Sequence, residues 1–528
     1  MTVSTAIHDT IVIGGGHNGL TTAAYLARAG RRVRVLEARS VVGGAAVTEE
    51  FIPGFRNSTA SYTVSLLHPK VIADLQLHQH GLQIVHRPLP NFMPLPDGRA
   101  LLNGNSLQQT QAEFAKFSAA DADRLPAYYD WLEGAANVLR SQLLHTPPNL
   151  GGGWRDWWRS GRLALAIRSQ SAASRQAIFE LFTRSAAELL EQWFENPHIQ
   201  ALFGFDAIVG HFASPYEAGS GYVLLHHVFG EVNGRSGAWG HAIGGMGAIS
   251  NAIAASATKA GAIIECDKPV IHIKRVDATV LEVETEDGHQ YRSKSVAANC
   301  TPKRLMALCQ DDVVTDETRA SINRTRYGSG TFRMNVALSA LPSFTAQPHA
   351  GAHLSAGIII GPTLDYMARA FEDARREGWS AEPVIEMLIP STLDDTLAPS
   401  GQHVASLFCQ HVQPQMSDGR QWPDLRDEVA RHMLSTVERY APGFVDSVIG
   451  YEALSPYDLE TRLGLTNGDI FHGALTPAQL FSARPAPTLA DYRIAIPGIY
   501  LCGSGAHPGG GVSGLPGHNA AREILRDL

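Results

Sequence analysis

The first forty residues alternate between short apolar runs and one amphipathic stretch. Residues 11–13 are continuously apolar, which is typical of a parallel strand that is covered on both faces. Apolar residues then recur at helical spacing across residues 20–27, and Gly30 follows as a helix terminator. A second apolar run occupies residues 33–36. This order predicts a β-α-β unit that opens a doubly wound domain.

The pattern changes twice in the middle of the chain. Residues 105–230 are mainly helical in pattern, with apolar positions three and four apart across 130–144 and 175–194. Short β-like runs follow within residues 263–300, and Asp287-Gly288 between two of them is a hairpin-turn signal. The hydrophobic pattern therefore predicts a helical insertion followed by strands.

The C-terminal forty residues return to the character of the N-terminus. An apolar strand at 499–501 leads into a glycine-rich stretch at 503–517, and a helix is expected over 519–528. The alternation predicts an α/β fold in which substrate-domain insertions interrupt a dinucleotide-binding domain with a parallel sheet.

The loop after the first strand carries the first chemical signal. Residues 14–19 read G-x-G-x-x-G: Gly14 permits the tight turn, Gly16 lets the backbone approach a pyrophosphate, and Gly19 allows close helix packing. The following helix directs free N–H groups at the phosphates. Glu37 ends the second strand, where an acid accepts from adenosine ribose hydroxyls and disfavours the 2′-phosphate of NADP.

The residues beyond Glu37 favour FAD over NAD. A second glycine pair, Gly43-Gly44, lets the backbone approach the diphosphate again, an extension that the simple NAD fingerprint does not require. Arg39, after Ala38, can reach the adenosine or phosphate side, or can be a solvated surface charge.

Several long motifs resemble the FAD-binding amine oxidase and phytoene desaturase superfamily. Residues 36–39 with 43–55, residues 237–247 and residues 501–511 are similar to its pyridine nucleotide-disulfide oxidoreductase domain-containing protein 2 branch. The resemblance spans nearly the whole chain. One departure matters: many relatives have arginine where Ala45 stands, so flavin contacts of that arginine cannot be transferred.

The resemblance implies a Rossmann-type FAD-binding domain, three-layered with a parallel sheet, and an inserted α+β substrate domain. It places Val270 beside adenine, Asn299 where the chain returns to the cofactor domain, and residues 503–517 around the ribityl chain and flavin ring, with Ser504 where many flavoproteins have an acid. The complete expected cofactor-binding set is Gly14, Gly16, Asn18, Gly19, Glu37, Ala38, Arg39, Gly43, Gly44, Ala45, Val270, Asn299, Gly503, Ser504, Gly510, Gly511 and Val512.

The expected domain segments follow from this reading. The FAD-binding domain and its insertions are expected as 1–100 (FAD-binding, first segment), 101–234 (mainly helical insertion), 235–310 (FAD-binding, second segment), 311–484 (substrate-binding domain) and 485–528 (FAD-binding, C-terminal segment).

Three residues are candidates for catalysis. The resemblance places Trp239 and His241 near the flavin and the substrate cavity, and His507 lies within the flavin loop. Each histidine could line the cavity or transfer a proton. The alternative is a histidine held by packing and hydrogen bonds.

The expected function is dehydrogenation of an apolar or amphipathic small organic substrate by hydride transfer to flavin N5. Oxygen or a quinone would then accept the electrons. The alternatives are an amine oxidase, with Trp239 and Tyr62 or Tyr222 as an aromatic cage, a redox-neutral isomerase, and a flavin-bearing interaction protein.

Composition and charge argue against some classes of binding partner. A net charge of −8 and a pI near 6.3 argue against a nucleic-acid partner. Five scattered cysteines without a C-x-x-C pair, and histidines without carboxylates at ligand spacing, indicate no metal. The absence of a signal-like N-terminus and of a long apolar run predicts a cytoplasmic protein.

One segment qualifies this expectation. Residues 154–175 combine three tryptophans with five arginines and one acid. Such a segment fits either a peripheral contact with an anionic membrane or a helix that packs domains together or forms a homodimer.

Overall fold

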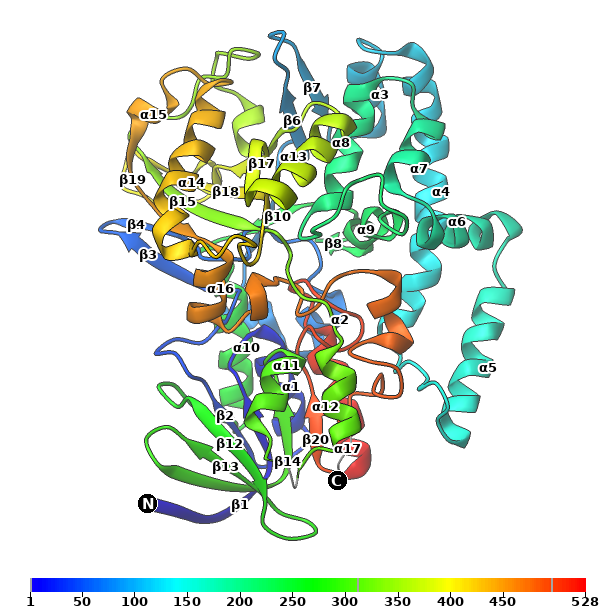
Figure 1. Ribbon diagram of the computed structural model, residues 1–528, viewed down its shortest axis with the longest axis vertical. Coiled ribbons are helices and arrows are strands. Elements are labelled where there is room, and N and C mark those ends of the chain that lie inside the picture. The colour runs from blue at the N-terminus through cyan, green and yellow to red at the C-terminus, as the bar shows by residue number, and fades with distance from the viewer. Residues whose placement is uncertain (1, 311–312, 495–496) are drawn as a thin grey trace.

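The computed structural model describes residues 2–310, 313–494 and 497–528, without the side chains of 2–6 and 226–227. Its first sheet lies in the lower half of Figure 1. The strands of this sheet are β1 (Thr2–Ile13), β2 (Val33–Leu36), β11 (Ile263–Glu265), β12 (Val270–Arg275), β13 (Leu281–Thr285), β14 (His289–Ala298) and β20 (Ile499–Leu501). The order is β11-β2-β1-β14-β13-β12, and β20 pairs with the end of β14.

The first sheet has a parallel part and an antiparallel arm. β1 pairs in parallel with both β2 and β14, and β11 and β20 extend the parallel part at either side. β12 and β13 join β14 in antiparallel fashion, with Asp287-Gly288 at the turn between β13 and β14. The expected Rossmann-type α/β fold is confirmed.

Helices from both ends of the chain cover this sheet. Helix α1 (His17–Arg28) packs against α10 (Gly247–Lys259) and against α17 (Leu515–Asp527). Leu20 of α1 and Ile11 of β1 are fully buried in the same hydrophobic cluster. The apolar run at 11–13 and the small residues of α1 therefore form the core that fixes the loop between them.

The second sheet, at the upper left of Figure 1, is mainly antiparallel. In spatial order it contains β19 (Val448–Leu454), β15 (Phe332–Leu338), β18 (His403–Val412), β17 (Trp379–Leu388), β16 (Gly357–Ile360), β6 (Asn91–Pro94) and β7 (Ala100–Asn103). All seven residues of β15 are buried, and α13 (Leu364–Glu377) and α14 (Trp422–Glu438) pack against the sheet. Because β6 and β7 belong here, the chain leaves the first sheet before the expected segment end at residue 100.

A group of helices stands beside the second sheet and extends down along the side of the domain built on the first sheet (Figure 1). It consists of α3 (Leu107–Phe114), α4 (Ala119–Leu143), α5 (Trp154–Arg168), α6 (Ala172–Thr183), α7 (Ala186–Trp193), α8 (Pro197–Ile208) and α9 (Gly221–His226). The helix expected over 175–194 is divided into α6 and α7 because Ser185 and Glu188 form a capping box at the start of α7. The expected helix at 130–144 begins earlier, after the N-cap Ser118.

Short helices and two-stranded pairs connect the two sheets and the group of helices. They are α2 (Pro69–Asp74), α11 (Pro302–Leu308), α12 (Asp316–Asn323), α15 (Phe444–Ser447) and α16 (Pro456–Leu463), with the strand pairs β3 (Thr48–Ile52) and β4 (Phe55–Ser58), β5 (Ile84–His86) and β10 (Gly240–Ala242), and β8 (Glu231–Val232) and β9 (Arg235–Ser236).

Candidate functional site

A cavity of about 450 Å³ is lined by residues from both sheets. Many residues of the sequence-derived set line it: Gly14, Gly16, Asn18, Glu37, Ala38, Arg39, Gly44, Ala45, Trp239, Val270, Asn299, Ser504, Gly511 and Val512. Segments that are almost 500 residues apart in the chain therefore meet at one space.

The glycines of the first loop allow the chain to approach itself. A Cβ added to Gly19 would lie 2.2 Å from the carbonyl oxygen of Gly14, so only glycine lets α1 start this close to the turn. A Cβ on Gly16 would lie 2.6 Å from Asn299 Nδ2. Gly14 has φ +94°, in the region that favours glycine. The loop thus leads into the N-terminus of a twelve-residue helix, and the first residues of this helix line the cavity.

The second glycine pair lies directly against the first loop. Gly43 N–H donates to the Gly15 carbonyl oxygen at 2.8 Å, and Gly16 and Gly43 form a parallel β-bridge. A Cβ on Gly44 would lie 3.3 Å from the Cα of Gly16. The glycines of the first loop and the second glycine pair together form one backbone surface without side chains. Gly19 and Gly43 do not line the cavity themselves but support this surface from behind.

Glu37 joins this surface to the end of β2. Its Oε2 accepts from Gly15 N–H at 2.6 Å, and its Oε1 accepts from Arg39 N–H at 2.9 Å. Each carboxylate oxygen keeps a further lone pair for a ligand hydroxyl. Glu37 therefore fixes the loop as well as facing the cavity.

Besides Ser65 Oγ and His472 Nδ1, three buried polar atoms of lining residues have no protein hydrogen-bond partner. They are Arg39 Nη1, Asn18 Oδ1 and His17 Nε2. Arg39 is held from its other side by Glu49, with Nη2 2.5 Å from Oε1. Because buried polar groups normally have partners, these orphaned atoms fit a polar ligand such as the diphosphate of a dinucleotide.

His17 was not expected at the site, although it stands inside the glycine motif. Burial lowers its pKa to about 4, so the ring is neutral at neutral pH. A second lining histidine, His472, comes from an irregular segment, and burial lowers its pKa to about 3. Only the first carried a sequence signal, as the first residue of a helix at a phosphate loop.

A buried arginine holds the C-terminal loop. Arg484 Nη2 donates to the Ser504 carbonyl at 2.8 Å, and Nη1 donates to the Gln479 carbonyl at 3.2 Å. Ser504, Gly511 and Val512 face the cavity, whereas Gly503 and Gly510 lie behind it. A Cβ on Gly510 would lie 2.1 Å from Phe471, so this glycine admits a lining ring instead of lining the cavity itself.

The end of the cavity next to the second sheet is aromatic. Tyr62, Trp239 and Phe408 line it together with Val209 and Ile470. The Tyr62 ring stacks on Phe408 with centroids 5.4 Å apart. This wall can hold an apolar molecule and exclude water from it.

Charged residues support the aromatic wall from behind. Tyr62 Oη donates to Glu386 Oε2 at 2.5 Å, and the Arg333 guanidinium lies 4.4 Å from the Tyr62 ring centroid. The Arg87 guanidinium lies 5.8 Å from the Trp239 ring centroid. Burial raises the pKa of Glu386, against the attraction of Arg87. No sequence pattern points to this group, because its members are scattered between residues 62 and 386.

The His241 ring lies in a buried hydrogen-bonded group. The ring does not line the cavity; its Nε2 lies 3.0 Å from Asp394 Oδ2, which also accepts from Gly244 N–H at 2.7 Å. Although burial opposes ionisation of Asp394, hydrogen bonds from His241, Thr396 and Gly244 lower its pKa to about 2. His241 thus helps to hold the 244–245 glycine turn by hydrogen bonding.

His507 is also held by packing and a hydrogen bond. It lies outside the lining, with Nε2 3.2 Å from the Gln142 carbonyl and its ring edge-on to Phe481. Burial lowers its pKa to about 4. Of the three catalytic candidates, only Trp239 reaches the cavity. Tyr222 also lies outside the lining and packs on Phe182, whereas Tyr62 lines the cavity.

A metal site and a membrane-spanning helix are both absent from the part of the chain that the structure describes. Within it, no group of three or more metal-ligating side chains has a geometry that could hold an ion. Within the same residues, no helix combines the length and apolar character that crossing a bilayer requires.

Comparison with known proteins shows the family to which the chain belongs. Residues 19–331 match the model of the family described as flavin containing amine oxidoreductase. The rat pyridine nucleotide-disulfide oxidoreductase domain-containing protein 2 is 40% identical, over 99% of this chain and 94% of its own. A lycopene-forming phytoene desaturase from Pseudescherichia vulneris is 24% identical over 96% of each chain.

Solved structures support the fold. A putrescine oxidase bound to putrescine has a TM-score of 0.59 and 14% identity, covering 99% of this chain and 98% of its own. The resemblance expected from the motifs is confirmed, as is FAD as the cofactor. The chain belongs to the flavin-containing amine oxidoreductase family, and it is an FAD-dependent oxidoreductase.

Proposed function

We propose that the protein dehydrogenates an apolar or amphipathic small organic molecule at the aromatic end of the cavity. The observation that carries this proposal is the continuity of one cavity from the glycine loops to Tyr62, Trp239 and Phe408. Bound FAD would supply the hydride acceptor, flavin N5. The chain's own residues would bind, orient and shield the two reactants.

The cofactor would be held along the cavity by residues from four segments. Backbone N–H groups of residues 14–19 and the free Nη1 of Arg39 would hold the diphosphate, and Glu37 would accept from ribose hydroxyls. Val270 would face the adenine, and Asn299, Ser504, Gly511 and Val512 would hold the ribityl and flavin end. The three orphaned polar atoms support this placement.

The aromatic wall would position the substrate. Tyr62 is fixed on both sides, by its hydrogen bond to Glu386 and by the stack with Phe408, so its ring is a preorganised surface. Val209 and Ile470 add aliphatic surface that keeps water out. A C–H bond held against such a wall needs no charged partner in the cavity.

Amine oxidation is the second candidate. Tyr62 and Trp239 both line the cavity, as an aromatic cage requires, and acidic side chains lie behind it. Burial raises the pKa of Asp206 to about 8, and Glu386 adds to the effect. Asp206 does not line the cavity and is mostly protonated at neutral pH, so the support for this candidate is the pair of aromatic side chains.

Product analysis separates the candidates. The FAD-loaded protein is incubated aerobically, and separately with a soluble quinone, with a polyene, a cyclic alkene or an amine. We expect a product lighter by two hydrogens from an alkene or polyene. Conversion of the amine alone to a carbonyl compound would replace the proposal by the amine oxidase, and a product of unchanged mass would replace it by a redox-neutral isomerase.

A further inference from the structure

Helix α5 presents three tryptophans to solvent and turns an ion pair towards the protein. The inward residues Asp156 and Arg159 have side chains only 13% and 11% exposed, and they pair at 3.0 Å. Outward, Trp154, Trp157 and Trp158 are 76%, 78% and 64% exposed. Leu165, on the same face, is 68% exposed, and no residue of the helix is buried. In Figure 1, α5 lies at the side of the molecule.

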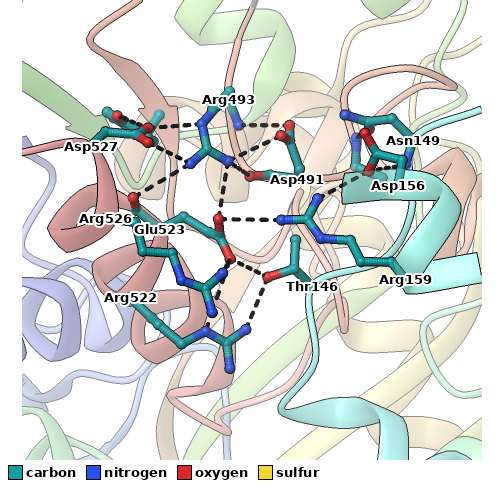
Figure 2. Close-up of polar contacts among 12 residues, drawn as sticks. Thr146, Asn149, Asp156, Arg159, Asp491, Arg493, Arg522, Glu523, Arg526 and Asp527 are labelled. Carbon is teal, nitrogen blue, oxygen red and sulfur yellow. Dashed lines mark hydrogen bonds and ion pairs between the residues drawn. The ribbon is translucent and has the colours of Figure 1, made fainter. Parts of the chain in front are cut away.

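This orientation is fixed by a buried charge network, which Figure 2 shows. Arg159 Nη2 lies 3.4 Å from Oε2 of Glu523 on α17, a carboxylate that Arg493 and Arg526 also approach, at 3.1 and 2.6 Å. Asp156 Oδ1 also accepts from Asn149 N–H at 3.0 Å. Turning the tryptophans inward would break these contacts and leave the Glu523 carboxylate without a partner on α5.

Three exposed tryptophans on one helix form an apolar surface that an isolated molecule in water rarely carries. Its rim is basic. The Arg155 guanidinium lies 5.7 Å from the Trp154 ring centroid, and the Arg162 guanidinium lies 5.2 Å from that of Trp158. Tryptophan flanked by arginine is the composition that favours the interface between lipid headgroups and acyl chains.

The positive charge around the tryptophans of α5 favours a membrane over a second copy of this chain as the partner of this surface. A two-fold contact through α5 would bring the same arginines of both copies together, which costs free energy. An anionic surface would instead attract them. The chain as a whole carries −8, so attraction to such a surface must come from this local patch and must weaken with salt.

We propose that α5 docks the protein peripherally on an anionic lipid bilayer, with Trp154, Trp157 and Trp158 in the interface and Arg155 and Arg168, both exposed residues of this helix, at the headgroups. The helix lies on the bilayer and does not cross it. This inference is independent of the substrate proposed above.

Vesicle flotation of the full-length FAD-loaded protein tests the proposal. The vesicles are pure phosphatidylcholine or phosphatidylcholine with phosphatidylglycerol. We expect flotation with the anionic vesicles, loss of it at high salt, and a blue shift of tryptophan emission on binding. The variant Trp154→Ala/Trp157→Ala/Trp158→Ala and the variant Arg155→Glu/Arg168→Glu should each reduce binding at least about tenfold.

The matched control is Ile449→Ala/Tyr457→Ala, which removes two exposed apolar side chains elsewhere on the surface and should float as the parent does. Retained FAD and unchanged circular dichroism show that each variant is folded. The proposal is overturned if the parent fails to float with anionic vesicles, or if the tryptophan variant floats as well as the parent. It is also overturned if the tryptophans instead hold a dimer that the triple variant dissociates without any vesicle binding.

Discussion

Glu37 accepts a hydrogen bond from the backbone N–H of Gly15 at 2.6 Å, so the acid after the second strand holds the loop after the first. The same carboxylate fixes its own neighbour Arg39 through a backbone N–H. The shape of the phosphate loop and the position of the arginine beside it therefore depend on one side chain.

Replacing Glu37 should weaken FAD binding. Glu37→Gln keeps the shape but loses the charge, and a charge-assisted hydrogen bond contributes about 1.5–3 kcal/mol. We expect a roughly 10- to 100-fold higher Kd for FAD, measured by fluorescence titration of the apoprotein. Glu113→Gln, on the surface of α3, is the control and should leave the Kd unchanged. Equal affinities in Glu37→Gln and the parent would refute the role of this carboxylate.

Gly19 should tolerate no side chain. Gly19→Ala places a Cβ against the backbone oxygen of Gly14, and such overpacking costs about 1–3 kcal/mol. We expect a lower Tm and a loss of bound FAD. Gly161→Ala has open space around it inside helix α5 and should stabilise by up to about 1 kcal/mol. A Tm for Gly19→Ala at or above that of Gly161→Ala would contradict the packing argument.

Glu386 should be essential for stability. Glu386→Ala removes the acceptor of the Tyr62 hydroxyl and the carboxylate that attracts the buried Arg87 and Arg333, and leaving buried groups without such a partner costs about 1–3 kcal/mol. Denaturant unfolding measures this loss. Glu382→Ala on the same strand removes an exposed carboxylate 3.4 Å from Arg439 and should cost less than about 1 kcal/mol. Similar losses in both variants would count against the buried charge group.

Buried histidines should make the fold sensitive to acid. Burial lowers the pKa of His507 from 6.5 to about 4, so between these values the unfolded chain binds a proton that the folded chain does not. Stability therefore falls as the pH drops from about 6.5 towards about 4, by about 3 kcal/mol for this residue at most. We expect a smaller fall of Tm with pH in His507→Gln than in the exposed control His349→Gln. Parallel Tm profiles in both would disprove the assignment.

Substitution of Trp239 should slow the reaction, whereas substitution of His507 should leave its rate nearly unchanged. Trp239→Ala removes a wall of the cavity and should slow anaerobic flavin reduction by at least about tenfold. His507→Gln, outside the lining, should leave that rate within about threefold of the parent. The reverse order would restore His507 as a catalytic candidate.

The sequence predicted those parts of the site whose chemistry is local. The turn at Gly14, the helix start at Gly16 and the acid at Glu37 lie within one β-α-β unit, so their spacing alone determines that they meet. The C-terminal loop could be placed only by resemblance, because parallel strands joined by long crossovers give no local signal of their neighbours.

Tertiary contacts determined what the sequence could not predict. His241 lies only two residues after Trp239, but Trp239 precedes β10 and lines the cavity, whereas the His241 ring within β10 contacts Asp394 from a distant turn. Tyr62 and Glu386 are 324 positions apart, and no pattern in the chain connects them. For α5, the amphipathic pattern was visible, but Glu523 determines which face turns outward.

Anaerobic stopped-flow mixing tests the central claim most directly. The FAD-loaded protein is mixed with polyenes, cyclic alkenes and amines while the absorbance of oxidised flavin is followed. We expect bleaching by at least one alkene or polyene, and slower bleaching in Trp239→Ala. Bleaching by amines alone, or no bleaching by any compound of the panel, would contradict it.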